Sequence, residues 1–288
     1  MKKIRNKIKQ NAKIITAFVL GAILTGGTVY AATVLPSSQV GYDNSTSGLA
    51  STNVQDALDE LYTKANTWID PTAHIESMQN FDPSSIPNIG NSAIVYDARD
   101  GNEYIVRRLK DGKVWMTQNL RLINKTISSA DSNLPSGETY TVPASNLSSF
   151  TTSYNTNSAY LDSTYGGYYN FYTATAGWGT NSVTSGNSPK DICPKGWRLP
   201  TNNGGGSDYY GLTQSYPSST LLQGDPGLIF SGRVESGSVA KQGSKGYYWS
   251  SSVVNKSNAY NVDLDSSSVS GINNFNKYNG FSVRCMAM

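Results

Sequence analysis

The stretch Ile192-Cys193-Pro194-Lys195-Gly196-Trp197-Arg198-Leu199-Pro200 joins a cysteine, turn residues and a large ring within nine positions. Gly196 and Pro200 are expected to shape a turn, and Trp197 is expected to be a core ring. Cys193 has one counterpart, Cys285. If the chain is exported, an even pair favours one disulfide, which would contribute about 4–5 kcal/mol in the chain-entropy model. The alternative is two free buried thiols.

The N-terminal residues carry the three parts of a secretory signal. Residues 1–13 hold six basic residues and no acid, an uncharged apolar run follows over 14–24, and small residues lead to Ala31. We therefore expect residues 1–31 to be a signal peptide that is cut after Ala31. The alternative is an uncleaved membrane anchor, because the charge-free stretch 14–42 is long enough to span a bilayer. Both alternatives predict an extracellular or cell-surface location.

The leader also accounts for the basic net charge. The chain has 23 Lys and Arg against 20 Asp and Glu, so removing the six basic residues of the leader leaves 17 against 20, a net charge of −3. The positive balance is therefore no argument for nucleic acid, and we expect none as a partner. Tyrosine outnumbers phenylalanine 19 to 7. This composition fits a loop-rich extracellular fold with half-exposed rings.

Residues 32–91 are expected to form a stalk, with a helix over about 52–65 and a proline-containing linker after it. The expected helix can be capped by Ser51, Thr52 or Asn53, and it carries one apolar stripe. It is too short to be stable alone, so it needs the main domain or a copy of itself as a partner. Residues 40–65 resemble a short repeat of phage tail-fibre proteins and of Gram-positive surface proteins. That resemblance implies a stalk or a homo-oligomerisation element.

The remaining residues, 92–288, are expected to form the main domain from short strands. Asp111-Gly112 lies between two strand-like runs, 103–109 and 113–116, and predicts a hairpin. Residues 124–158 contain few large apolar groups and are expected to be a long surface insertion. The other predicted elements are strands at 93–96, 246–253, 259–264 and 281–286, a flexible loop at 201–207, and weak helices at 208–214 and near 167–176.

Several motifs follow one another in a recognisable order. They are YDARDGNEY from Tyr96, VWMTQNL from Val114, GYYN from Gly167, the block from Ile192, FSG from Phe230, YWSS from Tyr248 and SVRC from Ser282. In this order they resemble the Fibrobacter succinogenes major paralogous domain family over roughly residues 92–288. That family is similar to C-type lectin-like domains.

This resemblance implies an α+β fold with short antiparallel strands, two short helices and long loops on one face. It also implies that the first and last strands pair, and that Cys193 pairs with Cys285. We interpret the motif residues as structural: Trp115, Trp197 and Trp249 as core rings, and Asn119 and Arg284 as groups that satisfy buried polar atoms.

The residues favour no catalytic or metal chemistry. His74 is the single histidine and lies in the predicted linker, and no nucleotide, hydrolase or zinc motif is present. The formylglycine-generating oxidases share a similar fold, but they need a reactive cysteine pair where this chain has its expected structural disulfide. We therefore expect no enzyme and no cofactor.

Calcium is the remaining cofactor to weigh. Sugar-binding C-type lectins place Trp-Asn-Asp on a late strand, whereas this chain has Trp249-Ser250-Ser251, and hydroxyls are poorer calcium ligands than carboxylates. Asp263 and Asp265 alternate on one strand and could hold a cation with Asp225 or Asp208. A solvated strand face is the favoured interpretation.

The functional class that remains is recognition of a ligand at the protein surface. Tyrosine offers a flat ring with a polar tip at low entropic cost, which suits glycan and protein ligands. The chain is therefore expected to be a non-catalytic extracellular binding or adhesion module for a glycan or protein. The alternative is a structural component of the envelope or of a fibre. The candidate ligand-binding rings lie in stretches that contain Gly, Ser and Asn, and they are Tyr160, Tyr165, Tyr209, Tyr210, Tyr247 and Tyr278.

Overall fold

The computed structural model describes residues 39–41, 43, 50–67 and 76–288, and the chain divides into two units, Met1–Ala65 and Asn66–Met288. The predicted signal or anchor over residues 1–31 and His74 lie outside the described residues. In the ranges that are described, no helix has both the length and the apolar character needed to cross a membrane.

The first unit contains helix α2, Val54–Thr67, where the sequence predicts a helix over about 52–65. Asn53 is the residue that caps it: its Oδ1 accepts a hydrogen bond from the backbone N of Asp56 at 2.9 Å. Ala57 is buried, whereas Leu58 on the same predicted stripe is 50 % exposed. The apolar stripe is thus only partly covered within the described chain.

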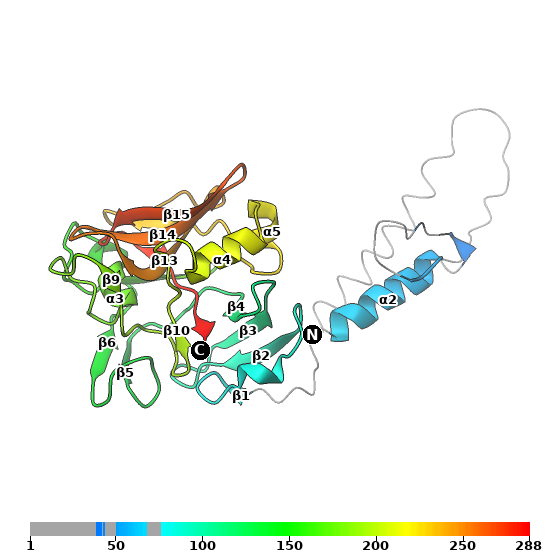
Figure 1. The fold of residues 1–288 in the computed structure, drawn as a ribbon, viewed down its shortest axis with the longest axis horizontal. Coiled ribbons are helices and arrows are strands. Elements are labelled where there is room, and N and C mark those ends of the chain that lie inside the picture. The colour runs from blue at the N-terminus through cyan, green and yellow to red at the C-terminus, as the bar shows by residue number, and fades with distance from the viewer. Residues whose placement is uncertain (1–38, 42, 44–49, 68–75) are drawn as a thin grey trace. The chain divides into compact units, whose positions relative to one another are not determined.

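The second unit is rich in sheet and contains only short helices (Figure 1). One sheet has six strands in the order β1-β2-β3-β4-β17-β10. The predicted hairpin at Asp111-Gly112 is confirmed, because β3 and β4 pair in antiparallel fashion and Gly112 has a φ of +80°. The strands are β1 Glu76–Ser77, β2 Ser92–Tyr96, β3 Glu103–Arg108, β4 Val114–Met116, β10 Trp197–Arg198 and β17 Met286–Ala287.

The other large sheet has seven strands in the order β15-β14-β13-β16-β8-β7, and β9 pairs with β13. The strand β13 is buried along nearly its whole length, because Tyr248 faces one apolar cluster while Tyr247 and Trp249 face another. The strands are β7 Ala159–Asp162, β8 Gly166–Tyr169, β9 Gly186–Asn187, β13 Lys245–Val253, β14 Asn258–Asp265, β15 Val269–Asn276 and β16 Phe281–Ser282.

The largest core lies between these sheets and includes Val95 and Val106 from the first and Trp249 and Phe281 from the second. A second core lies where helices cover β13 and β14, through residues such as Leu212. The helices are α3 Phe171–Ala174, α4 Asp208–Ser215 and α5 Ser219–Gln223, with single 3₁₀ turns η2 Pro83–Ser85 and η3 Leu147–Ser149. The predicted helix at 208–214 corresponds to α4. The helix predicted near 167–176 is present only as the four residues of α3, because residues 166–169 form β8.

Three expectations are corrected. The predicted linker belongs to the second unit from Glu76 onward, because Met78 and Ile86 are buried in its core. The predicted insertion at 124–158 contains a hairpin that Ile127 and Val142 anchor in the same core. Its strands are β5 Lys125–Ser128 and β6 Thr139–Val142, and the remaining hairpin of the unit joins β11 Arg233–Glu235 to β12 Ser238–Ala240.

The third correction concerns the end of the domain. The predicted single strand at 281–286 is two strands, because β16 pairs with β8 and β13 whereas β17 pairs with β4 and β10. The resemblance implied that the first and last strands pair. In the structure the last strand, β17, pairs with neither β1 nor β2. The chain changes sheets between Ser282 and Met286, and the residues between them are all buried.

Candidate functional site

The disulfide predicted from the two cysteines is present. Cys193 and Cys285 are bonded and both are 0 % exposed. The backbone oxygen of Cys285 accepts from Met116 N at 3.0 Å, so the bridge ties the end of the domain to β4 and to the block that begins at Ile192. Gly196 has a φ of +82°, a left-handed conformation that favours glycine in the turn before Trp197.

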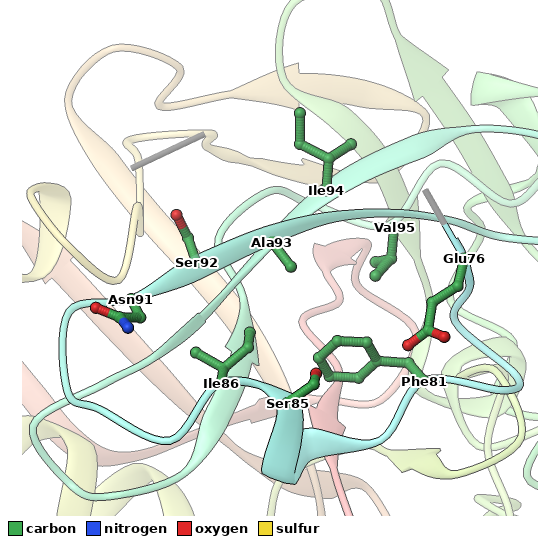
Figure 2. A pocket seen from close by; sticks show the side chains of 9 residues that line it. All are labelled: Glu76, Phe81, Ser85, Ile86, Asn91, Ser92, Ala93, Ile94 and Val95. Carbon is green, nitrogen blue, oxygen red and sulfur yellow. The ribbon is translucent and has the colours of Figure 1, made fainter. Parts of the chain in front are cut away.

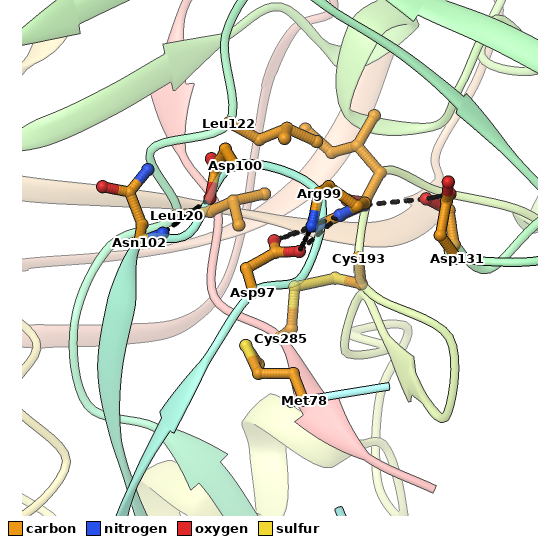
Figure 3. A network of polar contacts seen from close by, with 12 residues as sticks. Met78, Asp97, Arg99, Asp100, Asn102, Leu120, Leu122, Asp131, Cys193 and Cys285 are labelled. Carbon is orange, nitrogen blue, oxygen red and sulfur yellow. Dashed lines mark hydrogen bonds and ion pairs between the residues drawn. A yellow bond between two sulfur atoms is a disulfide. The ribbon is translucent and has the colours of Figure 1, made fainter. Parts of the chain in front are cut away.

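A buried ion pair lies beside the disulfide (Figure 3). The guanidinium of Arg99 donates to both carboxylate oxygens of Asp97, and the two side chains are 2 % and 0 % exposed. Arg99 also donates to Ser132 Oγ at 2.9 Å and to the backbone oxygen of Ile192 at 2.8 Å. Nε, Nη1 and Nη2 each donate to a protein acceptor, so the pair joins the β2–β3 turn to the cysteine block and has a structural role.

A second carboxylate, Asp208 at the start of α4, holds three elements together. Arg198 donates to both of its oxygens at 2.6 and 3.0 Å, and Lys113 Nζ donates at 2.6 Å. Burial opposes ionisation of Asp208, but these hydrogen bonds and those from Thr201 outweigh it and hold its pKa well below the usual range. The carboxylate is 5 % exposed, so it is a structural anchor.

Asp191 fixes the loop on the other side of Cys193. Its carboxylate accepts from the backbone N of Cys193 at 2.8 Å, from Leu199 N at 2.9 Å and from Asn133 Nδ2 at 2.8 Å. Burial raises the pKa of Asp191 to about 6, against the opposing effect of these hydrogen bonds. A raised carboxyl pKa often marks an active site, but here two backbone donors of the cysteine block and the Asn133 amide already occupy the carboxylate.

The motif residues Asn119 and Arg284 also contact one another. Arg284 Nε donates to Asn119 Oδ1 at 2.6 Å, and Nη1 donates to the backbone oxygens of Met116 at 3.2 Å and Pro226 at 3.3 Å. Arg284 is 1 % exposed, and burial lowers its pKa. Trp115, Trp197 and Trp249 are likewise at most 1 % exposed. These five motif residues thus build the interior of the domain.

Sequence reasoning missed Lys277, which is 0 % exposed. Its Nζ donates to the backbone oxygens of Thr180 at 3.0 Å and Val183 at 2.9 Å and lies 5.8 Å from the centre of the Phe171 ring. Among the described residues no carboxylate pairs with it. Burial lowers its pKa to about 8. Nothing in the surrounding run of Asn and Gly residues signals a buried amine.

The six candidate tyrosines do not form one site. Tyr209 and Tyr247 are 0 % and 3 % exposed, which corrects their assignment as ligand-binding rings: both rings are packed in the core. Tyr160 and Tyr165 pack on a small third cluster, and the Tyr278 ring lies 5.3 Å from the ring of Tyr154. Tyr160, Tyr165, Tyr210 and Tyr278 are all partly exposed.

Tyr210 lines a groove. This groove, of about 380 Å³, runs between α4 and β15 and is lined by Tyr210, Thr213, Gln214, Pro217 and the strand residues 269–272. Its lining contains no acid and no base. We call it the α4–β15 groove. Only Tyr210 of its lining was a predicted site residue. The sequence signal that could have pointed to the strand side of the groove is Ile272, the one large apolar residue in the run 270–274. In the structure Ile272 is 42 % exposed.

A second cavity, of about 320 Å³, lies between η2 and β2 (Figure 2). Phe81, Ile86 and Ala93 contribute apolar groups, and Glu76 contributes the one carboxylate. Glu76 is the first described residue after residues 68–75.

The carboxylates suggested for a cation do not converge. Asp265 accepts from Ser267 and Ser268 and pairs with Lys245 at 3.0 Å, while Asp263 accepts from Asn273 at 3.0 Å. Asp225 pairs with Arg107, and Asp208 is held as described above. Within the described ranges no three His, Cys, Asp or Glu residues stand close enough to hold a metal ion.

Residues 111–205 match the family model described as the Fibrobacter succinogenes major domain. The match spans about a third of the 288 residues and runs from the β3–β4 turn through the cysteine block. No curated protein and no solved structure matches this chain.

Proposed function

We propose that this chain is a non-catalytic extracellular binding module that recognises a glycan or protein ligand at its surface. The observation that carries the proposal is the α4–β15 groove, which presents the partly exposed ring of Tyr210 beside uncharged residues. Such a combination of an aromatic ring and neutral polar groups suits ligands that carry little charge. The leader over residues 1–31 and the structural disulfide support an extracellular location.

The finer fold assignment is part of this proposal. A disulfide that ties the end of the domain to its centre, together with short strands and few helices, supports a C-type lectin-like domain. The buried, bonded cysteines do not support an oxidase, since that chemistry needs a reactive pair. Calcium-dependent sugar binding lacks support too, because Asp263 and Asp265 are engaged elsewhere.

The test is a paired glycan and protein array with the full chain and a Tyr210→Ala variant. We expect at least one ligand that binds the wild type and binds Tyr210→Ala at least tenfold more weakly. Tyr278→Ala is the matched control, because its ring is also partly exposed but lies away from the groove. Silence on both arrays, or equal loss in the two variants, would count against the proposal.

A structural role in the envelope or in a fibre is the second candidate, and the exposure of Leu58 favours it. A half-exposed leucine on an amphipathic helix is suited to self-association. Light scattering of the full chain and of Leu58→Lys tests this role. An oligomer that dissociates in the variant supports a fibre or stalk function, and a wild-type monomer excludes it.

A further inference from the structure

The strand β15 forms one end of the seven-stranded sheet. In the part of the chain that the structure describes, β15 pairs only with β14, so its outer side is an open edge. The backbone N–H of Asn274 is an exception to the free groups of this strand, because it donates to Asn273 Oδ1 at 2.8 Å. The sequence of β15, VSGINNFN, has no charged residue and no proline. Natural sheets usually protect such an edge with lysine, proline or a covering element, because its free N–H and C=O groups attract another strand.

The open edge lies beside a helix. Helix α4 packs on the sheet through Tyr209 and Leu212 and leaves Tyr210 facing the groove. The helix approaches β15 closely at Gly271, where a Cβ would come within 2.6 Å of Thr213 Oγ1. Strand and helix thus form the two walls of the α4–β15 groove.

A bulge shapes the strand wall. Asn261 is opposite Asn273, and Asp263 is opposite Ser270, so the two residues Gly271 and Ile272 stand opposite the single residue between them on β14. Bulges often re-aim a side chain next to a functional site. Here Ile272 lines the groove and is 42 % exposed.

We propose that the α4–β15 groove binds an extended, uncharged segment of polypeptide, which adds a strand to β15 and sets alternate side chains against Tyr210 and Ile272. This inference rests on the proposed function and narrows its ligand to one class. An extended peptide supplies the N–H and C=O partners that an open edge needs, and pockets beside the edge select its side chains. The uncharged lining gives a charged side chain no partner, so it selects a neutral segment.

The groove suits a glycan less well. Glycan recognition requires several side-chain donors and acceptors that converge on hydroxyl groups. In the groove the Thr213 hydroxyl already donates to the backbone oxygen of Tyr210 at 3.0 Å. The other polar side chains of the lining are Tyr210, Gln214 and Ser270, and the edge of β15 adds a row of backbone groups to them.

The test uses the full chain and a phage-displayed library of random twelve-residue peptides, followed by a synthetic copy of the strongest selected peptide. We expect neutral peptides with alternating apolar residues, and added hydrogen-exchange protection at the amides of residues 269–276 on binding. Ile272→Lys should weaken binding of the synthetic peptide at least tenfold. Leu161→Lys is the matched control, because Leu161 is 38 % exposed on β7 at the opposite end of the same sheet, and it should change binding less than twofold.

The outcomes separate this inference from the proposed function. Strand addition would be overturned if no peptide is selected or if the Ile272→Lys and Leu161→Lys variants bind the peptide equally well. It would also be overturned if the added hydrogen-exchange protection lies outside β15. A glycan that binds the wild type and is lost in Tyr210→Ala would also overturn it, while leaving the binding module in place. If Ile272→Lys fails to fold, Gln214→Lys, on the exposed helix wall, places the same charge in the groove and should also weaken the peptide at least tenfold.

Discussion

Arg284 Nε donates to Asn119 Oδ1 at 2.6 Å, so a buried cation is held by an amide and by backbone oxygens. Among the described residues no carboxylate pairs with this guanidinium. The two residues are 165 positions apart and join the segment after β4 to the segment between β16 and β17. The interaction therefore fixes the point at which the chain passes from one large sheet to the other.

Replacing Arg284 by methionine is expected to destabilise the domain by about 3 kcal/mol, because Asn119 and the backbone oxygens of Met116, Pro226 and Gly227 lose this donor. Urea unfolding at neutral pH measures this change. Lys241→Met, at an exposed position, is the control and should change the free energy of unfolding by less than about 0.5 kcal/mol. A double-mutant cycle with Asn119→Ala should give a coupling of about 1–3 kcal/mol, and a coupling near zero would refute the pairing.

Removing the disulfide is expected to cost about 2–5 kcal/mol, because Cys193 and Cys285 are separated by 92 positions and their link restricts the unfolded chain. The double variant Cys193→Ser with Cys285→Ser should unfold at lower urea than the wild type. Reductant should lower the wild-type midpoint toward that of the double variant and leave the double variant unchanged. A wild type that is indifferent to reductant under unfolding conditions would contradict this expectation.

Asp208→Asn is expected to destabilise the domain by about 3 kcal/mol at neutral pH, because Arg198 and Lys113 lose a charged acceptor that is 5 % exposed. The pKa of Asp208 is lowered in the folded state, so the ionised carboxylate contributes stability above its ordinary pKa, and that contribution is lost as the pH falls below it.

The difference between wild type and Asp208→Asn should therefore shrink between about pH 5 and pH 2, as followed by urea unfolding. Glu235→Gln is the control, because it removes an ion pair whose carboxylate is 42 % exposed. It should lower the free energy of unfolding by less than about 1 kcal/mol. A constant difference across this range would show that Asp208 does not titrate as expected.

Lys277→Met is expected to flatten the dependence of stability on alkaline pH. The folded state lowers the pKa of Lys277 from 10.5 to about 8, so between these values the unfolded chain binds the extra proton. Stability attributable to this group therefore rises as the pH increases from about 8 to 10.5. The comparison is wild type minus Lys277→Met in urea at pH 7, 8.5 and 10, with Lys241→Met as the exposed control. A difference that does not change with pH would refute a lowered pKa.

The sequence predicted the local parts of this fold best. Asp111-Gly112 specifies its hairpin through turn chemistry that acts within a few residues. The strand β15 was missed, because Asn273, Asn274 and Gly271 have poor strand propensity and the segment becomes extended only by pairing with β14. Helix α5 was missed as well, since its five residues lack a readable period.

The site was harder to predict than the fold. Tyr209 and Tyr210 are neighbours in the sequence, yet one is in the core and the other lines the groove. Successive residues on a helix point about 100° apart, so composition around a tyrosine cannot separate a core ring from a surface ring. The groove itself joins α4 to a strand about 55–60 positions later, and only tertiary pairing brings those segments together.

The positions of β16 and β17 in the sequence determine when the two large sheets can be completed during synthesis. Each large sheet receives a strand from the final eight positions, Phe281–Met288, and the disulfide partner Cys285 lies between them. While the ribosome still covers these positions, neither sheet has its full set of strands and Cys193 has no partner. Both sheets and the disulfide can therefore be completed only after residue 287 has been synthesised.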